Sequence, residues 1–178
     1  PDYDSHLNDR QLMQVDLTLA DRKSEVIAPE LRNEINSWNF PYHFIDFETS
    51  MVALPFTRGR KPYEQIAFQF SAHTLYENGH VEHHEWIDSN QGVFPNFEFV
   101  RQLKAVLEKD EGTIFRYATH ENTVLNQIKT QMIDTDESKY GDLIEWIETI
   151  TVWKDGKGHR PMVDMLKLVK DYYYHPLM

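Results

Sequence analysis

Ile45-Asp46-Phe47-Glu48-Thr49 is the stretch that decides the fold class of this chain. Side chains alternate between the two faces of a β-strand, so Asp46 and Glu48 share one face while Ile45 and Phe47 share the other. Two carboxylates held this close repel each other and lose hydration, so the pair favours a cation site. Such oxygen ligands suit Mg²⁺ or Mn²⁺, which also bind substrate phosphates. The alternative is an edge strand with a solvated acidic face.

The composition indicates a globular protein without disulfides. The 178 residues are 40% hydrophobic and include no cysteine, so the chain can bury a substantial core but offers no thiolate metal ligand. We expect a cytoplasmic protein with no membrane partner, because the sequence shows no apolar run of membrane-spanning length and no secretory leader. The net charge of −11 argues against nucleic acid as a partner unless basic residues gather locally.

The first part of the chain predicts an arm followed by three strands. Residues 1–20 lack a long periodic pattern and are expected to be an extended arm, and a short helix should run from Pro29 towards Trp38. Residues 1–38 would then be a linker. After the acidic strand, alternating apolar residues predict strands over Glu64–Tyr76 and His80–Asp88, joined by a hairpin turn at Asn78-Gly79.

The rest of the chain predicts helices that alternate with strands. The expected elements are a helix from Pro95 to Gly112, a strand over 113–118, helices over 120–132 and 138–150, a Gly-rich basic loop over 154–160, and a last amphipathic segment. Residues 39–178 are therefore expected to form one α/β domain, with a mixed central sheet flanked by helices.

This order, with Asp-x-Glu on the first strand, is that of the ribonuclease H-like exonuclease fold. Tyr42 to Thr49 resembles the first motif of DnaQ-like DEDD 3′–5′ exonucleases, and Arg60 to His73 resembles an uncharacterised bacterial family of predicted nucleases in that clan. The likeness covers about residues 40–178. Because members of that family often carry a Cas4-like or RecB-like nuclease domain upstream, the resemblance implies an adjoining nuclease domain in the same polypeptide as a partner.

The resemblance also implies two later acidic motifs. Glu121 takes the place of the second-motif aspartate at the start of a helix, although a helix-start glutamate can also serve only the helix dipole. For the last motif two interpretations stay open. His159 and Asp164 have the spacing of a general base and a metal ligand. Alternatively, Met162 to Leu168 resembles the segment before the last motif, the domain is truncated, and Asp164 is a structural acid.

The implied activity is two-metal hydrolysis of nucleic-acid phosphodiesters, with a single-stranded DNA or RNA 3′ end as the substrate. The expected catalytic set is Asp46, Glu48, Glu121 and Asp164, and the first three would bind Mg²⁺ or Mn²⁺. Substrate contacts are expected from the basic loops after the first strand and over 154–160, in which exposed Lys and Arg are common for other reasons. The candidates in the first loop are Arg58, Arg60, Lys61 and Tyr63, with Phe56 as a second stacking ring.

Three further interpretations compete with this one. His80, His83 and His84 invite a zinc site, but on a strand His83 faces away from the other two, so a solvated hairpin face is favoured. The domain could also be a catalytically inactive module that binds or scaffolds beside another nuclease domain. A third class is a metal-dependent hydrolase of small phosphorylated molecules.

Overall fold

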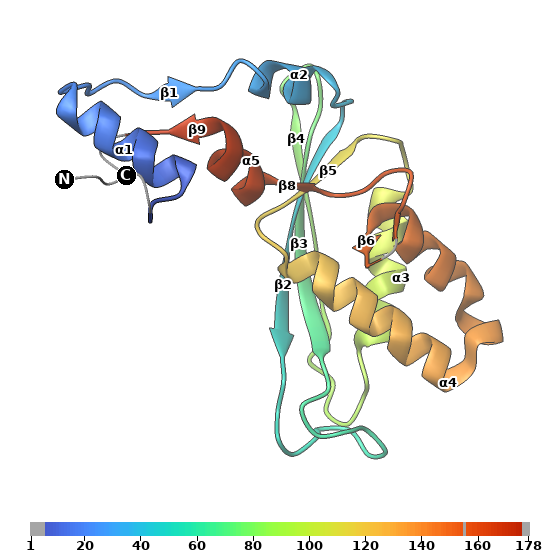
Figure 1. The fold of residues 1–178 in the computed structure, drawn as a ribbon. Helices are drawn as coiled ribbons and strands as arrows, with labels where there is room; N and C mark the ends of the chain where they lie inside the picture. Colours follow the sequence, from blue (N-terminus) through green and yellow to red (C-terminus); the bar gives the residue numbers. More distant parts are fainter. Residues whose placement is uncertain (1–5, 155, 176–178) are drawn as a thin grey trace. The chain divides into compact units, whose positions relative to one another are not determined.

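The computed structural model describes residues 6–154 and 156–175 (Figure 1). These residues divide into two compact units, one formed by Trp38–Met165 and the other by the residues up to Ser37 together with those from Leu166 onward. The expected boundary near residue 38 therefore coincides with a division between units. The residues from Leu166 onward group with the N-terminal segment, an arrangement that sequence patterns did not suggest.

A mixed sheet organises the larger unit. Its strands are β2 (Tyr42–Ser50), β3 (Ile66–Leu75), β4 (Val81–Ile87), β5 (Thr113–Arg116) and β8 (Val163–Asp164). Within the described residues these five strands lie in the order β4-β3-β2-β5-β8. The first three are antiparallel neighbours, whereas β5 runs parallel to β2 and β8 parallel to β5. The predicted mixed α/β architecture is confirmed.

The hairpin and the acidic strand follow the predicted local rules. Gly79 has a φ of +83°, which a glycine adopts without steric cost, and Tyr76 N donates to His80 O across the turn. Along β2, Ile45 and Phe47 are buried while the residues between and after them are exposed. The strand is therefore buried on one face and open on the other.

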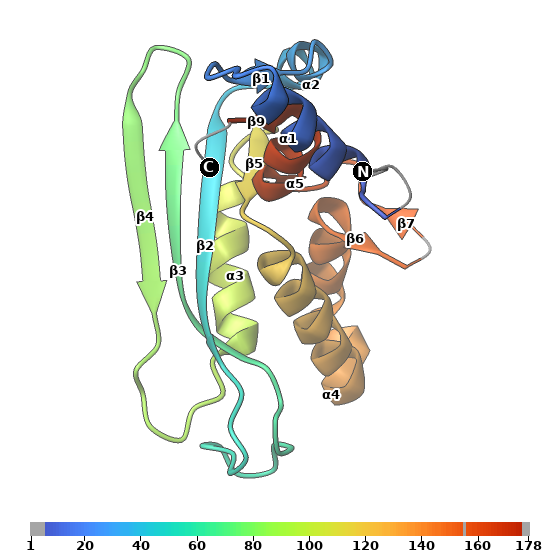
Figure 2. The ribbon, with the colours of Figure 1, turned by 60° about the vertical axis from the view of Figure 1, so that its left-hand side comes forward.

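Two helices cover the buried face of the sheet (Figure 2). They are α3 (Asn96–Leu107) and α4 (His120–Ile150). Phe99 of α3 is fully buried, and its ring packs edge-on against Phe47 of β2 and Phe70 of β3. Burying each aromatic side chain of this size stabilises the fold by about 1.5–3 kcal/mol. This packing fixes which face of β2 carries the exposed carboxylates.

The long helix α4 contains a kink where two helices were predicted. Asp136 has non-helical backbone angles, and its Oδ1 accepts hydrogen bonds from Ser138 Oγ and Lys139 N. These bonds lower the pKa of the Asp136 carboxyl, as expected for a helix cap. The short hairpin β6 (Val152–Trp153) and β7 (Gly156–Lys157) follows. It is attached to α4 because Asn122 donates to Val152 O and accepts from Val152 N.

The smaller unit contains helices and paired strands where an extended arm was expected. It contains α1 (Asp9–Leu19), β1 (Val26–Ile27), α2 (Leu31–Asn36), most of α5 (Met165–Tyr172) and β9 (Tyr173–Tyr174), with β1 and β9 paired antiparallel. The prediction for residues 1–20 is wrong over α1, and residues 1–5 lie outside the described part. Asn8 and Gln11 form a reciprocal capping box that starts α1. In the described chain, no helix is both long and apolar enough to cross a membrane.

Candidate functional site

The two carboxylates of the first motif lie on the open face of β2. Asp46 stands opposite Ser71 of β3, and Glu48 stands opposite Gln69. Both carboxylate-bearing residues are exposed. The pairing between β2 and β5 ends at Phe44, so in the described register the acidic end of β2 extends past β5. Asp46 and Glu48 are therefore accessible to a ligand from solvent.

Glu121 lies in the first turn of α4 and is almost completely buried, with 3% of its surface exposed. Burial is the main reason that its pKa is raised, and the negative charge of Asp46 adds to the rise. His120 and Arg116 act in the opposite direction. Within the described part of the chain, Glu121 Oε2 has no hydrogen-bond partner. Native structures leave few buried polar atoms in this state, so the atom needs a partner, which a proton, a water molecule or an ion supplies.

A side-chain contact joins the elements that carry these acids. Thr49 Oγ1 and His120 Nε2 lie 3.3 Å apart, within hydrogen-bond distance. Thr49 directly follows Glu48 on β2, and His120 directly precedes Glu121 on α4. The carboxyl end of β2 and the first turn of α4 are thus held side by side.

Asp164 occupies a different position. Its Oδ2 accepts a hydrogen bond from Arg116 Nη1 at 3.0 Å, and both side chains are at most 15% exposed. Arg116 lies two residues after the buried Ile114 on β5, so its side chain points to the buried face of the sheet. Asp164 is opposite Arg116 in the β5–β8 register and points to the same face. Asp46 points to the other face. The charges of Asp46 and Arg116 both act on the Glu121 carboxyl, and Arg116 is in turn paired with Asp164.

Across residues 6–154 and 156–175, no three histidine, aspartate or glutamate side chains form a group that could hold a metal ion. The three candidate acids of the acidic site thus do not form one ready-made metal-binding group: Asp46 and Glu48 are an exposed pair, and Glu121 is a buried carboxyl on which the charge of Asp46 acts. Mg²⁺ is commonly bound through one or two carboxylates, with waters and substrate phosphates as the remaining ligands. The donors are of the kind that such a cation takes.

A family model for proteins of unknown function matches residues 43–178, more than three quarters of the chain. The chain belongs to this family, Domain of unknown function (DUF2779). The matched DUF2779 region begins at His43 and so includes all of the acidic site. No curated protein and no solved structure matches the chain.

The first basic loop of the DUF2779 region contains one anchored arginine. Arg60 pairs with Glu64, and its guanidinium lies 3.6 Å from the centre of the Phe94 ring. This loop is therefore fastened to the segment that precedes α3. Arg60 is a structural residue in this arrangement, although the pattern of basic residues suggested a substrate contact.

The other candidates in this loop are exposed. Arg58 is exposed, and Lys61 makes a long ion pair of 3.6 Å with Asp134 while its side chain stays 80% exposed. Tyr63 is 64% exposed and has a positive φ of +57°. Phe56, 68% exposed, lines a cavity of about 570 Å³ that Ser50 also lines, two residues after Glu48. These side chains remain available to a ligand that reaches the acidic site.

The second basic loop is largely structural at its end. Arg160 donates to the backbone carbonyls of Gly112 and Leu107, which joins this loop to the turn after α3. His159 is exposed. Asp155 lies outside the described residues. The loop therefore offers fewer free cations than its sequence suggested.

The histidines of the β3–β4 hairpin are divided as predicted. His80 and His84 both approach the Glu82 carboxylate, at 3.6 and 3.4 Å. His83 lies on the other face, where its ring stacks on His73 and its Nε2 lies 3.0 Å from Ser71 Oγ. The three rings do not converge.

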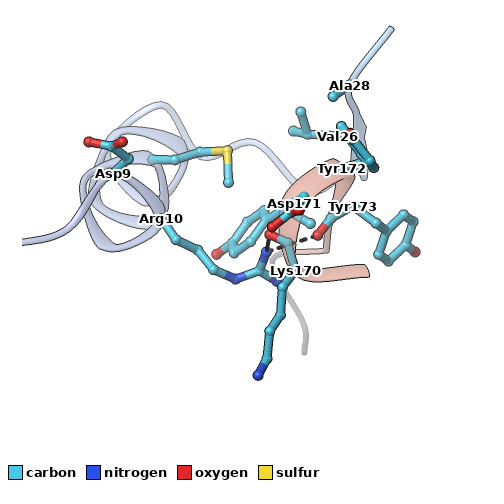
Figure 3. A pocket seen from close by; sticks show the side chains of 10 residues that line it. Asp9, Arg10, Val26, Ala28, Lys170, Asp171, Tyr172 and Tyr173 are labelled. Carbon is cyan, nitrogen blue, oxygen red and sulfur yellow. Dashed lines mark hydrogen bonds between the residues drawn. The ribbon is translucent and has the colours of Figure 1, made fainter. Parts of the chain in front are cut away.

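The smaller unit has a pocket of its own, of about 360 Å³ (Figure 3). Arg10 of α1 reaches into it, but its Nη1 already donates to the carbonyls of Lys170 and Tyr173. The guanidinium also lies 5.5 Å from the centre of the Tyr174 ring. Arg10 is thus used to join α1 to α5 and β9, and the pocket offers no comparable constellation of reactive groups.

Sequence reasoning missed three residues around the acids: Thr49, Arg116 and His120. Arg116 is 8% exposed, and its Nε has no hydrogen-bond partner within the described chain. An arginine at the end of an apolar strand, shortly before a helix with an acidic first turn, is the signal that could have identified it. The contact between Thr49 and His120 depends on tertiary packing and leaves no such signal.

Proposed function

We propose that the DUF2779 region is a ribonuclease H-like domain that hydrolyses nucleic-acid phosphodiesters in a divalent-cation-dependent, 3′–5′ exonuclease-like reaction. The order of three antiparallel strands followed by α/β alternation supports the fold assignment. So do Asp46 and Glu48 on the first strand and Glu121 at the start of the helix after β5. A single-stranded DNA or RNA 3′ end is the proposed substrate.

The observation that carries this proposal is the buried Glu121 Oε2, which has no partner within the described chain and belongs to a carboxyl on which the negative charge of Asp46 acts. A buried charged oxygen without a partner costs more than the 1–3 kcal/mol of an ordinary unsatisfied polar group. The negative charge of Asp46 adds to that cost, while a hydrogen bond from the Glu121 backbone and the charges of His120 and Arg116 reduce it. A cation bound by both carboxylates would remove both penalties. A glutamate with a purely structural role would need no such cation.

Asp46, Glu48 and Glu121 would hold Mg²⁺ or Mn²⁺. Such an ion supplies an activated water and stabilises negative charge on the phosphate oxygens. Asp46 and Glu48, exposed on the open face, leave room for the substrate phosphate and for water. Glu121 is buried, so its carboxylate is kept out of bulk solvent. Charge interactions are stronger in the protein interior than in water.

The exposed side chains of the loop after β2 would bind the rest of the strand. Arg58 and Lys61 would approach backbone phosphates, and Phe56 and Tyr63 would stack on bases. The cavity lined by Ser50 and Phe56 would accept a base next to the acidic site. Arg60 would act indirectly, by fastening the loop through Glu64 and Phe94.

The test is degradation of 3′-labelled and 5′-labelled single-stranded DNA and RNA with Mn²⁺. The wild type is compared with Asp46→Asn, Glu121→Gln and the control Glu85→Gln. Glu85 is also exposed, on β4 opposite Ser71, on the same face as Asp46 but two strands away. We expect the first two variants to lose activity and the control to keep it. An Asp46→Asn variant that degrades the oligonucleotides as fast as the wild type does would refute the proposal.

A second candidate is a module that binds nucleic acid or a neighbouring nuclease domain without catalysis. The ion pair between Arg116 and Asp164 favours it, because the carboxylate expected to be the last metal ligand is engaged by an arginine. The same experiment separates the two functions. Oligonucleotide binding without cleavage at any Mn²⁺ concentration would support the module.

A further inference from the structure

The candidate cation site is built from two elements, which creates a positioning problem. Asp46 and Glu48 belong to β2, whereas Glu121 belongs to α4. Ligands of one ion must be held within a fraction of an ångström, and supporting contacts usually provide that precision. Some contact must therefore fix the first turn of α4 against the end of β2.

Within the described residues, the first turn of α4 lacks a side-chain cap, although Asn122 bonds it to the β6–β7 hairpin. Thr119 is the N-cap residue, and its side chain makes no capping hydrogen bond in the described structure. The preceding residue, Ala118, has a φ of +67°, a conformation that is costly for a residue with a Cβ. A helix end without a cap tends to fray. Glu121 is in that uncapped turn.

The contact between Thr49 and His120 links this turn to β2. The β2–β3 register shifts between Glu48 and Thr49, and Thr49 lies opposite Ala67 of the hydrophobic core, so its side chain points to the face that the helices cover. The 3.3 Å contact with His120 lies one residue from Glu48 on β2 and one residue from Glu121 on α4. A hydrogen bond at this place restrains both ligand-bearing backbones.

We propose that His120 is a positioning residue whose hydrogen bond to Thr49 holds Glu121 against Asp46 and so completes the cation site. This inference rests on the proposed function, because it assumes that the acids bind a divalent cation. His120 does not bind the ion itself in this account. Its role is to fix α4 before the ion arrives, so that less ordering is needed on binding.

The test is the affinity for Mn²⁺, measured by titration calorimetry on the intact chain. We expect His120→Ala and Thr49→Val each to weaken Mn²⁺ binding by about threefold to tenfold, the worth of one hydrogen bond. The double variant should lose no more than either single variant, because both changes remove the same contact. His120→Asn, which keeps a side-chain N–H donor, should recover part of the affinity.

The matched control is His80→Ala, which removes another imidazole that is 61% exposed and lies beside the opposite end of the strands. It should bind Mn²⁺ as the wild type does. Unchanged affinity in His120→Ala, together with lost affinity in Asp46→Asn, would overturn this inference and leave the proposed function standing. Equal Mn²⁺ affinity in the wild type and Asp46→Asn would refute the cation site and the inference together.

Discussion

Replacing Glu121 by glutamine should stabilise the metal-free protein, although it removes a native side chain. The carboxylate is 3% exposed and its Oε2 has no described partner, so ionisation at neutral pH costs folding free energy. An unsatisfied buried group costs about 1–3 kcal/mol, and the charge and Asp46 add to this. Glutamine keeps the shape without the charge. We therefore expect a gain of about 1–3 kcal/mol, which is roughly 2–4 °C in Tm per kcal/mol for a chain of this size.

The pH dependence follows from the direction of the shift. Burial raises the pKa of Glu121 in the folded state, so the folded protein holds this proton more tightly than the unfolded chain does. The contribution of Glu121 to stability is complete below the ordinary glutamate pKa of about 4.3 and is lost as the pH rises through the folded-state value. The advantage of Glu121→Gln should accordingly grow as the pH is raised from acid to neutral.

The assay is thermal unfolding in EDTA and in excess Mn²⁺, for the wild type, Glu121→Gln and the exposed control Glu85→Gln. A ligand at one hundred times its Kd stabilises a protein by about 2.7 kcal/mol, so Mn²⁺ should raise the wild-type Tm and leave Glu121→Gln nearly unchanged. In excess Mn²⁺ the Tm advantage of Glu121→Gln should therefore nearly vanish, and it should reverse where the gain in EDTA is below about 2.7 kcal/mol. A Glu121→Gln variant that is less stable than the wild type in EDTA at neutral pH would refute the reasoning.

Three further predictions concern other parts of the larger unit. Arg116→Met should cost about 1.5–3 kcal/mol in urea unfolding, because the half-buried Asp164 carboxylate loses its charge-assisted hydrogen bond from Arg116; an unchanged midpoint would contradict this. His43 lies within hydrogen-bond distance of Thr74 and Asp110, and burial lowers its pKa. The contribution of His43 to stability is therefore present above the ordinary histidine pKa and is lost as the pH falls through the lowered value. His43→Gln should therefore flatten stability over that acid range, and an identical pH profile would oppose the assignment. Lys61→Ala should leave Tm unchanged, because its ion pair is exposed, but should lower the salt dependence of oligonucleotide binding by about one unit of slope; an unchanged slope would exclude Lys61 from the substrate path.

The fold was largely predictable because its signals are local. Alternation along β2 and the Asn78-Gly79 turn follow from strand geometry and from the freedom of glycine. The missed helix α1 also had a local signal, since Asn8 and Gln11 have the spacing of a capping box. Its weak apolar periodicity concealed it.

The site was less predictable because its details depend on tertiary contacts. The face on which Asp46 and Glu48 lie follows from the sequence, but the burial of Glu121 depends on how α4 packs on the sheet. Nothing in the sequence indicates that Arg116 pairs with Asp164 across two strands 48 residues apart. For the same reason Arg60 looks like a free cation in the sequence but pairs with Glu64 in the structure.

The most direct test of the account is the position of Mn²⁺ in crystals of the chain, located by its anomalous scattering. The account predicts a peak bound by Asp46 and Glu121, with Glu48 nearby, and no such peak in crystals of Asp46→Asn. A wild-type crystal with no Mn²⁺ at these carboxylates, or with Mn²⁺ bound only elsewhere, would contradict the claim that β2 and α4 together form a cation site.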